Sequence, residues 1–270
     1  MSVLDNLPPG EEIVRRRQGP VEWIVFNRPH ARNALTHAME SRLTDLLRGL
    51  NSDASVRAVV LTGAAGTKPA FMAGADMGDL EAAASPETSI RLEQSSEELM
   101  TALEQVRAPV IAAMAGACVG MGVLLASACD VRLASASLRF GFPIARTVGN
   151  CLSLKNYARL VSMIGPARTK DLVFDPTLLS GEQVAAMGAA KECVATEAAL
   201  LQRAQGVAEN LATLAPLTLW ATKESLRRLR DAAIPADPDQ ELLQACYVSK
   251  DYQEAIAAFV SKRAPVFTGR

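Results

Sequence analysis

Two glycine-containing turns are the segments of this sequence best suited to chemistry. In one of them, Gly120 and Gly122 flank Met121, between an apolar run over 110–114 and a second apolar run over 123–129. The first N–H groups of a helix lack partners within the helix, and the helix dipole favours negative charge beside them. Glycine also allows a ligand to approach the backbone closely. The pattern indicates a site for an oxyanion, and glycines that only pack a helix against a strand are the alternative explanation.

A similar turn lies earlier in the chain. A buried strand predicted over 58–62 leads through a loop to the segment FMAGAD over 71–76. A helix is predicted to begin near Met77, with Asp76 before it. Asp76 is a candidate base, but aspartate is also well suited to cap a helix N-terminus, and we favour that role.

These two turns, together with the segment FNRPHARNAL over 26–35, resemble the crotonase (enoyl-CoA hydratase/isomerase) superfamily. The resemblance covers nearly the whole chain. It implies an α/β fold, a crotonase-like spiral of ββα units with an acyl-CoA site in residues 1–200. It also implies a C-terminal helical trimerisation region over 201–270, which packs on the core and on neighbouring subunits of a homo-trimer or hexamer. The implied substrate is an acyl-CoA thioester, so coenzyme A is part of the substrate and no cofactor is bound permanently.

The resemblance also assigns site residues. In the family, two backbone amides form an oxyanion hole for the thioester oxygen, and the matching donors are the N–H groups of Ala75 and Met121. Such preorganised amides stabilise the negative charge of an enolate. The residues that the resemblance places along coenzyme A are His30, Arg32, Ala73, Ala75, Asp76, Met77, Phe259 and Lys262, of which the last two often come from a neighbouring subunit.

The acid–base residues of the family's hydratases are absent from this sequence. Those enzymes use two glutamates to activate water and to protonate the α-carbon, whereas the matching positions here hold Leu124 and Ile144. A third position, used by some isomerases, holds Ser153, and no carboxylate lies over 131–170. We therefore predict a lyase or isomerase that forms an enolate and is not an efficient hydratase; isomerisation and decarboxylation stay open. A catalytically silent acyl-CoA-binding or assembly subunit is the alternative.

The loop over 144–153 departs from the family's usual glycine-rich segment and is about one residue longer. Arg146 and Asn150 are tentative catalytic residues that would bind a polar acyl group, and a structural ion pair is an equal explanation for Arg146. Cys151 would be a nucleophile if its pKa were lowered. We favour a buried, unreactive thiol at this position.

Composition limits the classes of partner. Hydrophobic residues make up 49% of the 270-residue chain and the formal net charge is −1, which argues against nucleic acid, including an RNA-binding role, and against an anionic membrane. Five cysteines without CxxC spacing indicate reduced thiols, and two histidines are too few for the usual metal sites. The chain has neither a basic leader followed by an apolar stretch nor a membrane-length apolar run, so we expect a cytoplasmic protein.

Hydrophobic periodicity predicts the elements that position these residues. A hairpin over 12–17 and 21–27 precedes a helix from Thr36 to Leu50, a strand over 58–62, a helix over 89–106 with charges on its outer side, and a strand over 110–114. This alternation implies parallel strands with right-handed crossovers. Short strands follow over 131–134 and 138–140. Helices are then predicted over 152–161, 167–174, 181–187, 198–214, 217–232 and 239–262, the last broken near Lys250.

Overall fold

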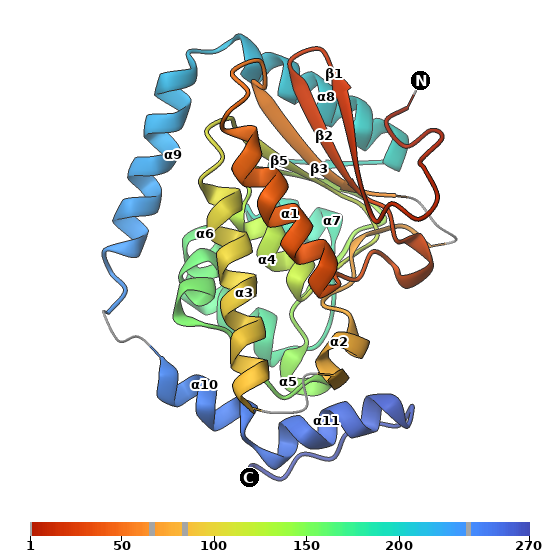
Figure 1. Cartoon of the computed structure of the whole chain (residues 1–270), viewed down its shortest axis with the longest axis vertical. Coiled ribbons are helices and arrows are strands. Elements are labelled where there is room, and N and C mark those ends of the chain that lie inside the picture. Colours follow the sequence, from red (N-terminus) through yellow and green to blue (C-terminus); the bar gives the residue numbers. More distant parts are fainter. Residues whose placement is uncertain (1, 65–67, 83–85, 236–238) are drawn as a thin grey trace.

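Two β-sheets form the centre of the computed structural model, which describes residues 2–64, 68–82, 86–235 and 239–270 (Figure 1). In the described residues the larger sheet has the order β1-β2-β3-β5-β7-β10 and the smaller one the order β4-β6-β8-β9. The β1–β2 and β8–β9 pairs are antiparallel and the other pairs are parallel. The strands are β1 (Ile13–Gln18), β2 (Val21–Phe26), β3 (Ala58–Gly63), β4 (Ala70–Met72), β5 (Val110–Met114), β6 (Ala117–Val119), β7 (Val131–Ser135), β8 (Arg139–Gly141), β9 (Leu179–Ser180) and β10 (Cys193–Val194).

Helices surround both sheets. They are α1 (His37–Leu50), α2 (Met77–Ala82), α3 (Pro86–Glu104), α4 (Met121–Ala128), α5 (Ile144–Thr147), α6 (Leu154–Phe174), α7 (Gly181–Ala186), α8 (Glu197–Thr213), α9 (Pro216–Asp231), α10 (Gln240–Tyr247) and α11 (Lys250–Val260). Within α6, Gly165 has a φ of 79° and Pro166 follows it, so the helix is kinked there. The kink lies in the gap between the helices predicted over 152–161 and 167–174. No helix in the described part of the chain is long and apolar enough to cross a membrane.

The predicted succession of ββα units is confirmed. Each of three strands in the larger sheet is followed by a short strand of the smaller sheet and then by a helix: β3 leads to β4 and α2, β5 to β6 and α4, and β7 to β8 and α5. Because consecutive units pair in parallel, the short strands β4, β6 and β8 lie side by side. The turns that follow β4 and β6 are therefore neighbours.

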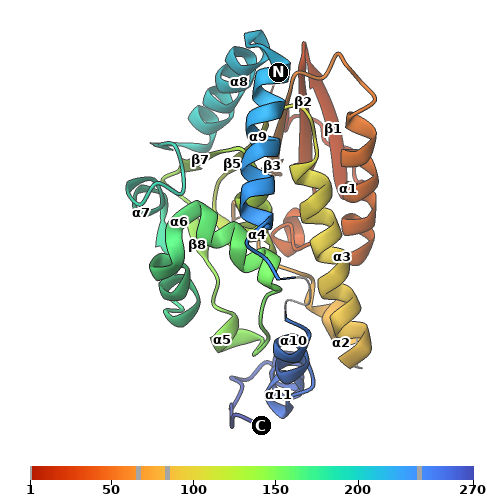
Figure 2. The ribbon, with the colours of Figure 1, turned by 90° about the vertical axis from the view of Figure 1, so that its left-hand side faces the viewer.

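Both faces of the larger sheet are buried. Along β3, Val59 and Leu61 pack in the core beneath α1, α3 and α4, whereas Ala58 and Val60 face α8. Figure 2 shows α8 on one side of the sheet and α1 on the other. Burial on both faces explains why this strand reads as an uninterrupted apolar run.

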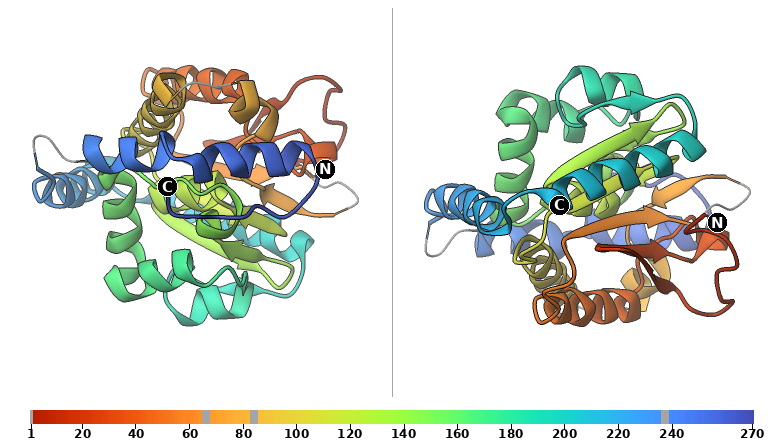
Figure 3. Two further views of the ribbon diagram at one scale, coloured as in Figure 1. Left: turned by 90° about the horizontal axis from the view of Figure 1, so that it is seen from below. Right: turned by 90° about the horizontal axis from the view of Figure 1, so that it is seen from above.

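The last three helices, α9, α10 and α11, form the C-terminal helical region. The predicted boundary at residues 200 and 201 falls inside α8, which packs on the larger sheet, so we place the start of the C-terminal helical region at α9. Helix α9 runs along the side of the molecule, and α10 and α11 cross its lower end (Figures 1 and 3). There α10 packs on α3, and α11 packs on α2.

Candidate functional site

A cavity of about 330 Å³ lies beside the two predicted turns. Its wall includes both of them, residues 73–77 and 119–121, and it is completed by side chains of α1, α3, α5, α10 and α11. The larger apolar side chains that line it are those of Leu35, Met77, Leu92, Val119, Met121, Leu124, Phe142, Pro143, Ile144, Val148, Leu152 and Phe259. An apolar cavity with a few polar groups suits a small organic ligand.

The turn before α4 exposes a backbone donor to this cavity. Met121 is the first residue of α4, and its N–H has no hydrogen-bond acceptor among the described residues. The preceding residue, Gly120, has φ 55° and ψ −113°, and its own N–H donates to the carbonyl of Gly141 at 3.2 Å. A Cβ on Gly122 would lie 2.4 Å from the carbonyl oxygen of Met72. Glycine is therefore required at 122 for close packing and at 120 for the positive φ.

The turn before α2 presents a second donor. Leu35 donates its N–H to the carbonyl of Gly74 at 2.9 Å and accepts from the N–H of Asp76 at 2.8 Å. The N–H of Ala75, between these two bonds, has no acceptor in the described part of the chain. The two turns touch, since a Cβ on Gly120 would lie 3.6 Å from the Cα of Gly74. The two predicted donors thus border one cavity.

Asp76 acts as a cap, as predicted. Its Oδ1 accepts the N–H of Gly78 at 2.9 Å, and its Oδ2 lies 2.6 Å from a guanidinium nitrogen of Arg28. Burial opposes ionisation of this carboxyl group, but Arg28 and the backbone N–H of Gly78 hold its pKa below the usual value. A carboxylate engaged in this way is a weak base.

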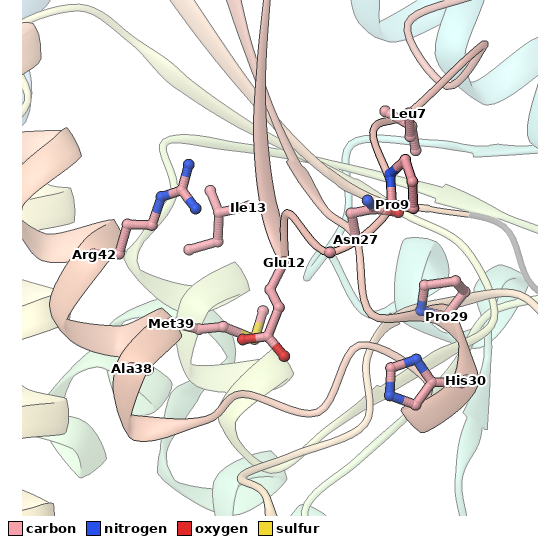
Figure 4. Close-up of a pocket in the computed structure, with 11 residues that line it drawn as sticks. Leu7, Pro9, Glu12, Ile13, Asn27, Pro29, His30, Ala38, Met39 and Arg42 are labelled. Carbon is pink, nitrogen blue, oxygen red and sulfur yellow. The ribbon is translucent and has the colours of Figure 1, made fainter.

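The residues predicted to bind coenzyme A are spread over several surfaces. Ala73, Asp76 and Met77 line the cavity, and Phe259 joins them from α11 of the same chain. His30 and Arg32 are exposed. His30 borders a separate hollow, where Figure 4 shows it beside Pro29 and across from Arg42 and Met39. Lys262 is exposed just beyond α11.

The loop over 144–153 contributes two polar residues to the cavity, Thr147 and Asn150. Asn150 lines it and donates from Nδ2 to the hydroxyl of Tyr247 at 3.1 Å, while its buried Oδ1 has no partner among the described residues. Arg146 is exposed and is not among the lining residues. Burial raises the pKa of the Cys151 thiol, and this opposes the nucleophilic role considered for it.

Two buried glutamates that the sequence analysis did not select also line the cavity. Leu124 and Ile144, at the positions of the hydratase glutamates, present apolar side chains, but Glu40 reaches the cavity from α1 and Glu93 from α3. The helix over 89–106 was predicted to carry charges on its outer side, and Glu93 of this helix is 8% exposed. The available signal was the helical spacing of Glu93 from the buried Met100, which lies about two turns later on the same face of α3.

The two glutamates differ in how they are held. Glu93 Oε1 accepts the N–H of Ser153 at 2.9 Å and Nδ2 of Asn156 at 3.1 Å, and its Oε2 accepts the Tyr247 hydroxyl at 3.2 Å. Glu40 Oε2 lies 3.5 Å from Nδ1 of His37, and its buried Oε1 has no partner in the described chain. Burial raises the pKa of both carboxyl groups, and the hydrogen bonds offset part of the rise.

The sequence and the fold of this chain are similar to those of known proteins. Residues 16–270 match the family model described as enoyl-CoA hydratase/isomerase. The 2,3-dehydroadipyl-CoA hydratase of Escherichia coli (strain K12) is 31% identical over 261 residues, covering 96% of this chain and 99% of that protein. Human enoyl-CoA hydratase domain-containing protein 2, mitochondrial, is 34% identical over 277 residues, covering 98% and 93%. A solved enoyl-CoA hydratase/carnithine racemase from Magnetospirillum magneticum superposes with a TM-score of 0.77 at 31% identity, with 96% of each chain covered.

Proposed function

Because the chain belongs to the enoyl-CoA hydratase/isomerase family, we propose that it binds an acyl-CoA thioester in the cavity and forms an enolate there. The N–H groups of Ala75 and Met121 hold the enolate oxygen. The observation that carries the proposal is that both groups border one apolar cavity and lack acceptors within the described residues. In an apolar surrounding, such donors stabilise a developing negative charge more strongly than water does.

We further propose that the reaction is not hydration. Water must be deprotonated as it attacks the β-carbon of an enoyl thioester, and the hydratases of the family use two glutamates for this acid–base work. Leu124 and Ile144 offer neither a proton acceptor nor a hydrogen bond to water at those positions. Isomerisation and decarboxylation need the enolate without an attacking water, so they fit the cavity better.

A silent acyl-CoA-binding or assembly subunit is the second candidate. It is favoured by the same two apolar residues, because a protein that only binds the thioester needs no acid–base group. It leaves unexplained the two carboxyl groups that line the cavity, since burying them costs free energy that apolar side chains would not cost.

A panel of acyl-CoA thioesters separates the two candidates. We expect some of them to raise the melting temperature, since a ligand that binds only the folded state stabilises it by mass action. For saturated acyl-CoAs that bind, the enolate function predicts enzyme-dependent exchange of the α-proton in deuterated water, measured by mass spectrometry. Binding across the panel without any exchange would identify the silent subunit, and free coenzyme A is the control for binding through the nucleotide alone.

We also propose that the chain assembles as a trimer or a dimer of trimers through its C-terminal helical region. Apolar side chains remain exposed on the last three helices: Leu217, Leu226, Leu229, Leu242, Phe259 and Val260. Exposed apolar side chains grouped on neighbouring elements often mark a subunit interface. Sedimentation velocity at micromolar concentration is expected to show three or six subunits, and a monomer would contradict the assembly.

A further inference from the structure

We propose that Glu93 is the base that removes the α-proton of the bound acyl-CoA and returns a proton to the same carbon. This role rests on the enolate function proposed above. In the forward step, the C–H bond breaks and an O–H bond forms on the Glu93 carboxylate. The electron pair of the C–H bond moves into the enolate, whose oxygen is held by the two backbone N–H groups. The reverse step restores the thioester and the carboxylate.

The carboxylate of Glu93 is held in place from three sides. Oε1 receives two hydrogen bonds, from Ser153 and Asn156 at the start of α6, whereas Oε2 receives one from Tyr247 of α10 in the described chain. A carboxylate oxygen has two lone pairs, so Oε2 retains one for an incoming proton. Tyr247 is itself fixed by Asn150. Tyr247 and Asn150 are positioning residues, and the carboxylate is the group that reacts.

Glu93 also has a route by which its proton can exchange with water. Besides the cavity, it borders a second hollow, which Glu97, Lys155 and Asp239 also line. Gln94, the next residue of α3, is exposed beside this second hollow. Glu93 therefore separates the apolar cavity from a polar surface. A proton taken from the substrate on one side can be exchanged with solvent on the other.

Glu40 is the competing candidate, and its surroundings suit the role less well. Oε1 of Glu40 has no partner in the described chain, and the neighbours that hydrogen-bond to its carboxyl group are Ser95 and Ser96 of α3 and His37, whose side chain is 56% exposed. A base works efficiently when hydrogen bonds and packing hold it in one orientation. The structure gives that support to Glu93.

The burial of Glu93 makes it a stronger base than a surface carboxylate. Loss of hydration raises its pKa, and the hydrogen bonds from Ser153, Asn156 and Tyr247 limit the rise. A carbon acid is a poor proton donor, so a base with a raised pKa takes the proton from carbon with a smaller free-energy penalty.

The decisive comparison is between Glu93→Gln and Glu40→Gln. Glutamine keeps the size of the side chain, an oxygen that accepts from Ser153 and Asn156, and an amide that bonds to the Tyr247 hydroxyl, but it cannot take the proton. We expect Glu93→Gln to bind acyl-CoA as tightly as the wild-type protein and to slow α-proton exchange by about 10²–10⁴-fold. Glu40→Gln, the same change at the other buried carboxyl group, is expected to retain exchange within about tenfold.

The outcomes distinguish the two proposals. Wild-type exchange that persists unchanged in Glu93→Gln overturns the role of Glu93 and leaves the enolate function standing. Acyl-CoA binding by the wild-type protein with no exchange overturns the enolate function, and with it the need for any base. Loss of exchange in Glu40→Gln alone would assign the base to Glu40 instead.

A pH profile gives a second test that does not depend on the folding of Glu93→Gln. The titratable groups around Glu93 are Glu97 on α3, Cys151, Lys155 and Tyr157 on α6, Asp239, and Tyr247 on α10. Glu40 and His37 of α1 border the same cavity. Burial raises the pKa of the cysteine and of both tyrosines, so these three stay neutral near pH 7. Exchange should therefore rise with pH as Glu93 loses its proton.

The Tyr247→Phe variant should shift this profile to higher pH. In the wild-type protein, the hydrogen bond from the Tyr247 hydroxyl lowers the pKa of Glu93. Removing this bond should therefore raise the pKa of Glu93 further. Glu97→Gln and His37→Gln serve as controls for the neighbouring groups on α3 and α1. A profile that stays at the wild-type position in Tyr247→Phe and moves in His37→Gln would overturn the assignment of Glu93.

Discussion

Crotonyl-CoA is expected to be hydrated by this protein far more slowly than by a relative that has both hydratase glutamates. Each general acid or base typically contributes about 10²–10⁴-fold to a rate, so the loss of both groups predicts a deficit of at least that size. Leu124 and Ile144 stand in their place and face the cavity. Enoyl thioester absorbance, followed at equal enzyme concentration, measures the difference.

The control for this expectation is binding. The deficit must be measured at saturating crotonyl-CoA, so that a weak affinity for this particular acyl group does not imitate a slow chemical step. Hydration at a rate comparable to that of the two-glutamate enzyme would contradict the prediction. In that case, loss of hydration in Glu93→Gln would identify the carboxylate that activates water, and retention would exclude it.

Replacing Met121 by proline is expected to reduce α-proton exchange by about 10²–10³-fold, the usual loss when one oxyanion donor is removed. Proline has no N–H, so the change deletes the proposed donor itself. Position 121 also suits proline, because it is the first residue of α4, where no intrahelical bond is lost. Gly120 has φ 55° and ψ −113°. These angles are the mirror image of extended backbone, a conformation that glycine can adopt before a proline.

Met121→Gly is the matched control. It removes the same side chain and keeps the amide, so it separates the donor from the shape of the acyl pocket. Exchange should survive in the glycine variant and fall in the proline variant, with both proteins showing the melting temperature expected of a folded chain. Equal exchange in the two variants would exclude the Met121 N–H as a donor.

The regular elements were predictable where a single helix or strand has a periodic pattern of its own. Helix α1 begins after Thr36, whose hydroxyl accepts the N–H of Met39 at 3.1 Å, and its end at Leu50 agrees with the prediction. The break predicted near Lys250 separates α10 from α11. By contrast, β4 and β6 have three residues each, too few for a periodic signal, and their existence depends on the neighbouring strands that they pair with.

The two backbone turns of the candidate site were predictable from the sequence, whereas its two buried carboxyl groups were not. The glycine turns have a local signature, and both lie at the cavity. Ser153 stands at a position that some isomerases of the family use for acid–base chemistry, and no carboxylate lies over 131–170 around it. Glu93 reaches the N–H of that same residue from sixty positions away, and only the packing of α3 against α6 brings them together. The helical spacing of Glu93 indicates that it is buried, but no feature of the local sequence indicates that it contacts Ser153.

The position of Tyr247 and Phe259 has a consequence for how the protein is made. Both lie in the last two helices, yet both line the cavity, and Tyr247 also bonds to Glu93. The two sheets are formed by residues up to Val194, which are synthesised before α10 and α11. The pocket therefore cannot be complete until the last two helices have been made, and a chain that ends before them would lack one wall of the cavity.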